Sequence, residues 1–332
     1  MVLGLGKDVM TVDPHSTTPA TPAAHILIAL LKLPGVGRKT VWRALQGRDA
    51  PSSLAEAVSR LRDKTFTPQE LEQASEYADA AVRASERLNI QIITIYDANY
   101  PPRLKEISDP PIVLHVKGDA GLLSWSNAVA IIGTREPTDF GRKSARRIAS
   151  CAAESGASVV SGLAIGCDTE AHRGCLDANG HTVAVLAHGL DKVYPAQNKS
   201  LASEILERGG CLVSEYEVGK TAFKMAFVDR DRLQSGLSQS VILIETGLKG
   251  GSLHTIRFAC EQHRLVACVK HPPKYATEEK ALGNAKLIEE GTALPLSTAE
   301  DVKSVLARIA SMSGSGKIAV SKPATAEQLK ML

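Results

Sequence analysis

The chain has 332 residues, of which 44% are hydrophobic and 23% charged, which excludes a disordered protein and fits about two globular domains with tails. No apolar run approaches the roughly 20 residues that cross a bilayer, and the N-terminal segment lacks the layout of a secretory signal. Because the net charge is only +3, a nucleic-acid surface would have to be a local cluster of basic residues. We therefore expect a cytoplasmic protein with no membrane partner.

Both ends of the chain differ in composition from the segment between residues 23 and 88. Residues 1–22, rich in Thr, Pro and Ala, and residues 311–332 are expected to be flexible tails. Between residues 23 and 88 apolar residues recur at intervals of three and four, and Pro51 and Pro68 mark helix starts, so we expect a small helical module.

The six cysteines form no CxxC pair, which predicts reduced thiols and no structural metal site.

A Leu-Pro-Gly-Val-Gly turn inside this helical module resembles a helix-hairpin-helix connection. In such a turn Gly35 and Gly37 expose backbone amides, while Arg38 and Lys39 reach a phosphate of DNA. A single copy of the turn is also compatible with a plain connector between helices or with a module that docks a partner. These four residues are therefore candidate DNA contacts, with the two other roles left open.

From residue 89 to residue 310 the apolar residues form short continuous runs of strand length. Helical stretches separate these runs, among them residues 141–156, 167–180, 198–210 and 253–263. Buried strands that alternate with helices predict an α/β domain with an extended, doubly wound, mostly parallel, Rossmann-like sheet. In such sheets ligands bind beyond the carboxyl ends of the strands, so a site is expected in the loops that follow the strands.

The first of these loops contains Gly133, Thr134 and Arg135, directly after the apolar run 128–132. The glycine lets the backbone turn close to the strand, and exposed N–H groups together with a guanidinium can hold a phosphate there. The three residues are therefore candidate phosphate contacts, although a single Gly-Thr-Arg turn is a weak signal by itself.

The helix after this loop carries a basic stripe, because Arg142 lies over Arg146 and Lys143 lies over Arg147 at i,i+4 spacing. Stacked like charges destabilise a helix unless a polyanion or an acidic partner relieves them. The stripe is therefore a candidate DNA contact, and a solvated helix face explains it equally well.

A second turn of small residues, which includes Ser161 and Gly162, leads from a strand into a helix and supplies two more candidate contacts. Asp168 lies in the first turn of that helix, and His172 follows four residues later on the same face, where a carboxylate can orient an imidazole. No nucleophile or third metal ligand accompanies this pair. A structural role is therefore favoured over catalysis, and we expect no cofactor and no metal.

A glycine-rich loop opens a later helix, and its amides, hydroxyls and positive helix end can cradle an anion, although such loops also serve as plain connectors. Its candidate contacts are Lys249, Gly250, Gly251, Ser252 and Thr255.

Another predicted helix begins near residues 229–232, whose charges alternate in sign and can partly cancel as local ion pairs. Arg230 and Arg232 are the candidate contacts in this segment. Neither GxxxxGK[ST] nor a GxGxxG after the first parallel strand occurs, which disfavours ordinary ATPases and NAD-dependent enzymes.

Eight segments, taken together and in order, resemble the DprA/Smf family of DNA-processing proteins. They are residues 33–40, 97–119, 130–136, 160–205, 212–219, 227–238, 245–269 and 284–302. The resemblance implies an extended Rossmann-like core that binds single-stranded DNA, protects incoming strands during natural transformation and assists the loading of RecA. It also implies a homodimer formed through the core and no catalytic activity.

The resemblance assigns roles to individual residues. Arg135 matches the Arg of the family's Gly-Ser-Arg turn, and Arg230 and Arg232 match two basic positions of its Phe-Pro-Arg-Arg-Asn-Arg segment. Residues 251–253 match its Gly-Ser-Leu. DNA contact by these residues is therefore what the resemblance implies.

This chain also departs from the family pattern. Val228 and Asp229 stand in place of Pro-Arg, Asp231 replaces Asn, Ile165 occupies a position that is usually Lys or Arg, and residues 270–271 replace Pro-Gly. A lost basic residue and two added carboxylates near one groove should weaken phosphate binding, because affinity follows the number of neutralised phosphates. The basic stripe is a candidate for compensation.

Two other functions remain open. Nucleoside-monophosphate phosphohydrolases with a similar fold carry Pro-Gly-Gly-x-Gly-Thr-x-x-Glu, but here Lys249 replaces Pro, Leu253 and His254 replace Gly-Thr, and Arg257 replaces Glu, which argues against that chemistry. The second alternative is a nucleotide-sensing or defence-associated relative that uses the same glycine loops for a small phosphorylated ligand. The altered basic positions motivate it.

Overall fold

The structure is a computed structural model that describes residues 19–62 and 64–312, so the expected tails lie outside the described residues apart from their inner ends. The helices are α1 (Pro22–Lys32), α2 (Arg38–Leu45), α3 (Leu54–Ser59), α4 (Pro68–Arg87), α5 (Pro102–Lys105), α6 (Asp139–Glu154), α7 (Cys167–Asp177), α8 (Lys199–Glu207), α9 (Lys224–Leu237), α10 (Ser252–Glu261), α11 (Glu279–Glu289) and α12 (Ala299–Met312). The strands are β1 (Gln91–Thr94), β2 (Val113–Gly118), β3 (Ala128–Ile132), β4 (Ser158–Ser161), β5 (Thr182–Leu186), β6 (Cys211–Ser214), β7 (Ser240–Leu243), β8 (Leu265–Val269) and β9 (Leu294–Leu296). Two short 3₁₀ helices cover Ala120–Ser124 and Ala196–Asn198.

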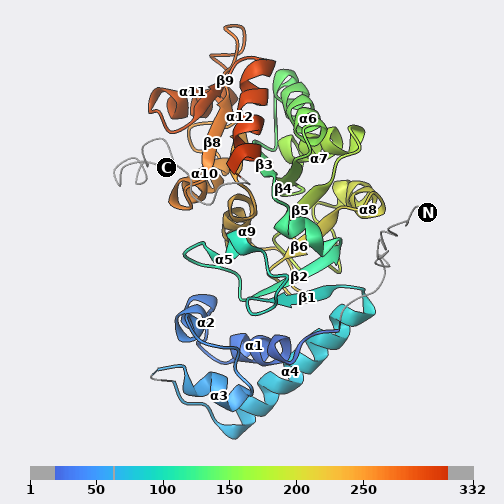
Figure 1. The fold of residues 1–332 in the computed structure, drawn as a ribbon, viewed down its shortest axis with the longest axis vertical. Helices are drawn as coiled ribbons and strands as arrows, with labels where there is room; N and C mark the ends of the chain where they lie inside the picture. Colours follow the sequence, from blue (N-terminus) through green and yellow to red (C-terminus); the bar gives the residue numbers. More distant parts are fainter. Residues whose placement is uncertain (1–18, 63, 313–332) are drawn as a thin grey trace, which may run out of the picture.

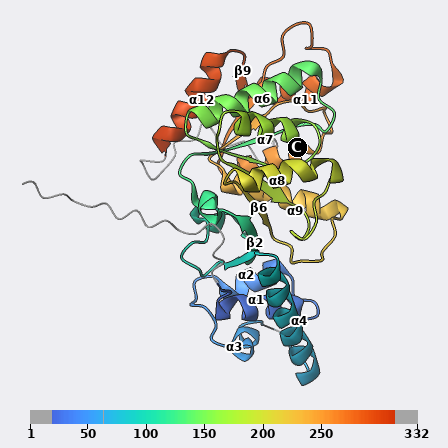
Figure 2. The same ribbon diagram turned by 90° about the vertical axis from the view of Figure 1, so that its right-hand side faces the viewer.

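Helices α1–α4 occupy the segment that the apolar spacing predicts to be helical. Helix α4 begins at Pro68, and a capping box fixes its start, because Thr67 accepts a hydrogen bond from the amide of Glu70 at 3.2 Å and donates its own amide to the Glu70 carboxylate at 2.8 Å. The apolar core of these helices includes Ile92 of β1 and Ile112 just before β2. Figures 1 and 2 show α1–α4 at one end of the molecule, beside these strands.

Within the described residues, nine strands form one sheet in the order β1-β2-β6-β5-β4-β3-β7-β8-β9. The pairs β1–β2 and β2–β6 are antiparallel, and all pairs from β6 to β9 are parallel. The predicted α/β class with a mostly parallel sheet is therefore confirmed. The antiparallel extension by β1 and β2 is a feature that the sequence pattern did not predict.

Both faces of the sheet are covered, as the continuous apolar strands require. In β3, Val129 and Ile131 point into a core shared with α6, α7 and α12, while Ala130 and Ile132 point into a core shared with α9 and α10. Strand β3 has β4 on one side and β7 on the other. The strand order thus reverses between β3 and β7, and a crevice is expected at the carboxyl ends of these two strands.

Candidate nucleic-acid interface

A cavity of about 540 Å³ opens at the carboxyl ends of β3 and β7; we call it the switch-point cavity. Its walls come mainly from the loop after β3, the loop between β7 and α10, and the first half of α9. Of the residues that the sequence makes candidates, it collects Gly133, Thr134, Arg135, Arg230, Lys249, Gly250, Gly251, Ser252 and Thr255. Turns that leave different strands therefore meet at one rim.

The turn after β3 leaves room for nothing larger than glycine. A Cβ atom at Gly133 would lie 2.5 Å from the sulfur of a buried cysteine on α7, and the amide of Thr134 donates to the carbonyl of Glu245 at 2.8 Å. This tight turn brings Arg135 to the mouth of the cavity, where its guanidinium lies 5.2 Å from the centre of the Phe227 ring. The loop therefore presents a positive charge beside an aromatic face.

The glycine-rich loop before α10 forms the opposite wall. A Cβ atom at Gly250 would lie 2.0 Å from the hydroxyl oxygen of Thr246, so only glycine fits there. Thr246 is buried, and its hydroxyl forms no hydrogen bond within the described residues. Helix α10 begins at Ser252, which also lines the cavity, while the amides of Leu253 and His254 donate to the carbonyls of Gly250 and Gly251 at 3.1 and 3.0 Å. The hydroxyls of Thr246 and Ser252, together with the positive end of the helix, are the groups of this wall that can contact an anion.

Three cations at the cavity are available to a ligand. Arg135, Lys224 and Lys249 are exposed, and none of them forms an ion pair within the part of the chain that the structure describes. The ammonium of Lys280 lies 3.9 Å from the carboxylate of Glu136. The lining also includes the exposed carboxylate of Glu279, so the mouth of the cavity carries more positive than negative charge.

The floor of the cavity, in contrast, holds buried and balanced charges. The Nε atom of Arg230 lies 3.4 Å from an oxygen of Asp231, and its Nη1 donates to the carbonyl of Val185 at 3.2 Å. Burial raises the pKa of Asp231 to about 7; Arg230 opposes this rise and the nearby Asp168 adds to it. Asp231 therefore changes its charge close to neutral pH.

Ser161 and Gly162 lie beneath the cavity and support it without lining it. The hydroxyl of Ser161 donates to the carbonyl of Ile131 at 2.7 Å. A Cβ atom at Gly162 would lie 1.3 Å from the guanidinium of Arg230. Gly162 is therefore needed because Arg230 passes directly over its backbone.

The Asp168–His172 pair that the spacing suggested does not form. His172 is fully buried and its Nδ1 lies 2.7 Å from the hydroxyl of Thr182, while the Asp168 carboxylate accepts the amides of Gly162 and Ala164 at 3.1 and 3.4 Å. Burial, with the charge of Arg230, lowers the pKa of His172 to about 3. His172 is packed inside the fold, whereas Asp168 holds the loop before α7 and lines the switch-point cavity.

The basic stripe on α6 faces solvent and does not line the switch-point cavity. Arg142, Lys143 and Arg146 are all exposed. The guanidinium of Arg146 lies 2.6 Å from the Asp177 carboxylate and 3.4 Å from that of Glu170. Part of the stripe is thus neutralised by neighbouring acidic side chains rather than by a ligand.

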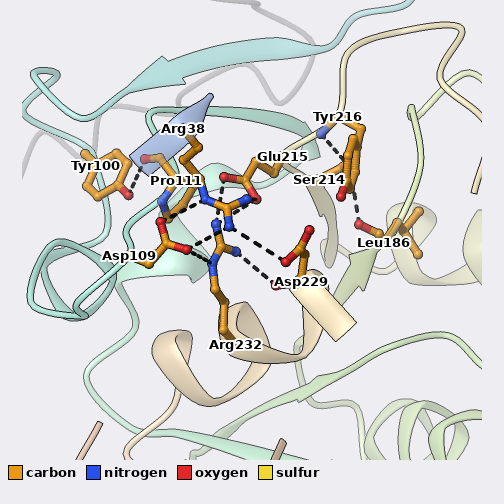
Figure 3. A network of polar contacts seen from close by, with 10 residues as sticks. All are labelled: Arg38, Tyr100, Asp109, Pro111, Leu186, Ser214, Glu215, Tyr216, Asp229 and Arg232. Carbon is orange, nitrogen blue, oxygen red and sulfur yellow. Dashed lines mark hydrogen bonds and ion pairs between the residues drawn. The ribbon is translucent and has the colours of Figure 1, made fainter. Parts of the chain in front are cut away.

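Arg232 and Arg38, both candidate DNA contacts, meet in a cluster of ion pairs between α1–α4 and the rest of the molecule (Figure 3). Arg232 lies 2.7 Å from an oxygen of Glu215, and Arg38 lies 2.7 Å from Asp109 and 3.2 Å from Glu215. Asp229 lies 3.7 Å from Arg38. Although burial opposes the charge of Arg38, the hydrogen bond to Asp109 and the neighbouring carboxylates raise its pKa above the usual value. We call these five residues the arginine–carboxylate cluster; its guanidinium groups are occupied.

The remaining residues of the helix-hairpin-helix-like turn stay at the surface. Gly35, Gly37 and Lys39 are exposed, and Gly35 has a φ of 66°, a left-handed conformation that favours glycine. Lys39 is one residue from Arg38, so the turn places one cation inward and one outward. None of its four candidate residues lines the switch-point cavity, although Arg38 contacts Asp229, which lies between the cavity-lining Val228 and Arg230.

Among the residues that line the cavity and were not predicted from the sequence are Lys224, Phe227, Thr246 and Lys280. Lys224 and Phe227 lie one helical turn apart at the start of α9, a spacing that brings them to one face. That spacing is a signal of a shared face that the sequence contains. Lys280 has no such signal, because it reaches the cavity from α11, far along the chain.

Within the described part of the chain, no helix is both long and apolar enough to cross a membrane. In the same residues, no group of three or more His, Cys, Asp and Glu side chains is arranged to hold a metal ion.

The chain matches known proteins over most of its length. The family model for DNA recombination-mediator protein A matches residues 91–307. DNA processing protein DprA of Bacillus subtilis is 35% identical over 262 residues, which is 79% of this chain and 86% of that protein. Protein Smf of Synechocystis is 39% identical over 212 residues, 63% of this chain, and the match spans only 52% of the Synechocystis protein.

Two solved structures are similar in both sequence and fold. DNA processing protein A of Streptococcus pneumoniae has a TM-score of 0.72 and 30% identity, covering 86% of this chain and 98% of that one. The structure of DNA processing protein A of Helicobacter pylori, described in terms of its single-stranded DNA binding mode, has a TM-score of 0.59 and 30% identity. It covers 66% of this chain and 97% of that one.

Proposed function

Because the chain belongs to the DNA recombination-mediator protein A family, whose members are DNA-processing proteins, we propose that it binds single-stranded DNA at the switch-point cavity and catalyses no reaction on it. The observation that carries this proposal is the convergence of Arg135, Lys224 and Lys249 on one rim, all exposed and unpaired within the described residues. Such cations bind phosphates without reading sequence.

The cavity also fits a base. Phe227 contacts the guanidinium of Arg135 and the ring of Tyr194, and a base can stack on this guanidinium or on these rings because every base has a π-face. A single strand offers unstacked bases to these groups, whereas the bases of a duplex are stacked on each other. The preference for single strands follows from this difference.

The buried acids support a binding role over a hydrolytic one. Asp168 is bound by backbone amides, and Asp231 lies against Arg230 in the floor, so neither carboxylate is free to activate a water molecule at the rim. The biological setting follows the family: we propose that the protein shields incoming strands during natural transformation in the cytoplasm, forms a homodimer and assists RecA.

Fluorescence anisotropy with a labelled thymidine oligonucleotide of about 20 residues tests the proposal. We expect the single strand to bind more tightly than a duplex of the same length, and the double variant Arg135→Ala, Lys249→Ala to lose about tenfold or more in affinity. Arg83→Ala removes one positive charge from an exposed position on α4, half the charge change of the double variant, and should change nothing. Equal affinity in all three proteins would reject the proposal. Tight binding of nucleoside monophosphates, with weak DNA binding, would favour a nucleotide-sensing role, and release of free base would indicate a phosphohydrolase.

A further inference from the structure

A second cavity, of about 700 Å³, lies among α6, α12 and the carboxyl ends of β8 and β9, and the proposed function does not use it. Its lining comes from α6, from residues 269–273 and from residues 296–302, and it shares no residue with the switch-point cavity. Its volume is in the range typical of small-molecule sites. We call it the α6/α12 cavity.

The side chains that line the α6/α12 cavity include basic residues but no acidic residue. The basic residues are Arg147, Lys270 and His271. His271 is already partnered, because its Nε2 lies 3.1 Å from the carboxylate of Glu245. Arg147 and Lys270 are exposed and form no ion pair with any residue that the structure describes. Two cations at the rim are therefore available to an anion.

The start of α12 does not supply this anion site. Asp301 accepts the amides of Ser297 and Thr298 at 2.8 and 2.9 Å, so the positive helix end already has its own carboxylate. Binding of an anion would rest on the two side chains, Arg147 and Lys270.

The interior of the cavity is apolar. Ile148, Val269, Leu296 and Val302 contribute aliphatic walls. The ring of Phe140 is stacked on Tyr275 with the ring centres 5.2 Å apart and is tilted against His271 at 5.4 Å. One face of Phe140 is thus covered, and the aliphatic walls offer no partners for the hydrogen-bonding edges of a base. An apolar body suits this interior better than a nucleobase does.

We propose that the α6/α12 cavity binds a small organic anion, whose carboxylate or phosphate contacts Arg147 and Lys270 while its apolar body fills the aliphatic interior. A ligand of this kind satisfies both halves of the site, since the cations lie at the rim and the apolar side chains lie inside. An inorganic anion would leave the interior empty, and a neutral apolar molecule would leave the cations without a partner.

The experiment uses the full chain and the fluorescent probe 8-anilinonaphthalene-1-sulfonate, which combines an anionic group with an apolar body. We expect saturable binding to the wild type that is weakened about tenfold or more by Arg147→Glu, which reverses a rim charge, and by Ser144→Trp, which fills the cavity from α6. Arg142→Glu makes the same charge change at an exposed position of α6 that does not line the cavity, and it should bind the probe like the wild type.

Displacement of the bound probe identifies the chemistry. Octanoate should displace it, whereas octanol, which has the same chain without the charge, and inorganic phosphate should not. Identical probe binding by all four proteins would overturn the proposal, as would equal displacement by octanol and octanoate. Displacement by a thymidine oligonucleotide would instead make this surface a part of the DNA path, and would also overturn it.

Discussion

Two regions of the molecule use arginine in opposite ways, and α9 contributes to both. Arg230 lies in the floor of the switch-point cavity, while Arg232, two residues along the same helix, lies in the arginine–carboxylate cluster. At the cavity mouth Arg135 has no carboxylate partner within the described residues, whereas Arg38 in the cluster contacts three. A basic residue therefore contributes to the binding of a polyanion only when the fold leaves its charge without a carboxylate partner.

The two regions differ in what their charges stabilise. In the cluster, Arg232 and Glu215 are 3% and 12% exposed, so removing one charge leaves its partner without compensation in a poorly solvated place. At the mouth of the cavity, an arginine is hydrated and its loss has little effect on folding. Substitutions in the cluster should therefore change stability, and substitutions at the mouth should change DNA affinity.

The largest effect is expected for Arg232→Ala. Loss of this guanidinium leaves Glu215 and Asp109 facing each other with only Arg38 between them, and the free energy of unfolding should fall by about 3 kcal/mol or more. Urea denaturation measures this change, with Arg83→Ala as the control. The affinity of the folded variant for single-stranded DNA should stay within about twofold of the wild type. A large loss of affinity at unchanged stability would remove the distinction between the two regions.

The next effect concerns Asp231 and pH. Its carboxyl has a pKa of about 7 in the folded chain against an ordinary value of 3.8, so the folded state holds a proton that the unfolded state has lost between these pH values. This contribution makes the protein less stable as the pH rises from about 4 to 7, because only the unfolded chain releases the proton in this range. Asp231→Asn should remove that decline, and urea denaturation at about pH 5 and pH 8 measures it.

The same substitution should affect binding. Ionised Asp231 adds a negative charge beneath the cations of the rim, so wild-type affinity for single-stranded DNA should weaken between about pH 6 and pH 8, and Asp231→Asn should weaken less. If the DNA affinity of the wild type and that of Asp231→Asn depended on pH in the same way, the charge of Asp231 would have no effect on binding at the rim.

The smallest effect is expected for the stripe on α6. Arg142 and Lys143 are exposed and lie outside the cavity lining, so the double variant Arg142→Ala, Lys143→Ala should lower single-strand affinity by no more than about threefold, through long-range attraction alone. Anisotropy titrations at low salt measure it. A loss as large as that of the cavity variant would extend the interface over α6.

Sequence reasoning predicted what depends on local pattern. Continuous apolar runs gave the parallel strands, and small residues such as Gly133 and Gly250 gave the turns, because close approach of backbone to neighbouring atoms demands glycine. The convergence of these turns followed from the general rule that ligands bind at the carboxyl edge of such sheets. These parts of the fold and the site could therefore be predicted from the sequence.

Ion pairs between side chains that lie far apart in the sequence could not be predicted. Arg38 is 71 residues from Asp109 and 177 residues from Glu215, so nothing in its neighbourhood reveals that its charge is neutralised. The antiparallel placement of β1 and β2 against β6 likewise depends on contacts far along the chain. One statement drawn from helical spacing, the Asp168–His172 pair, failed because the amides of the preceding loop satisfy the carboxylate.

The most direct test of this contrast is the salt dependence of single-strand binding by two matched arginine variants. If Arg135 neutralises a phosphate and Arg38 does not, the slope of log affinity against log salt concentration should become shallower by about 0.7 in Arg135→Ala and stay unchanged in Arg38→Ala. A shallower slope in Arg38→Ala, with the wild-type slope in Arg135→Ala, would contradict the account and place the DNA at the helical end of the molecule.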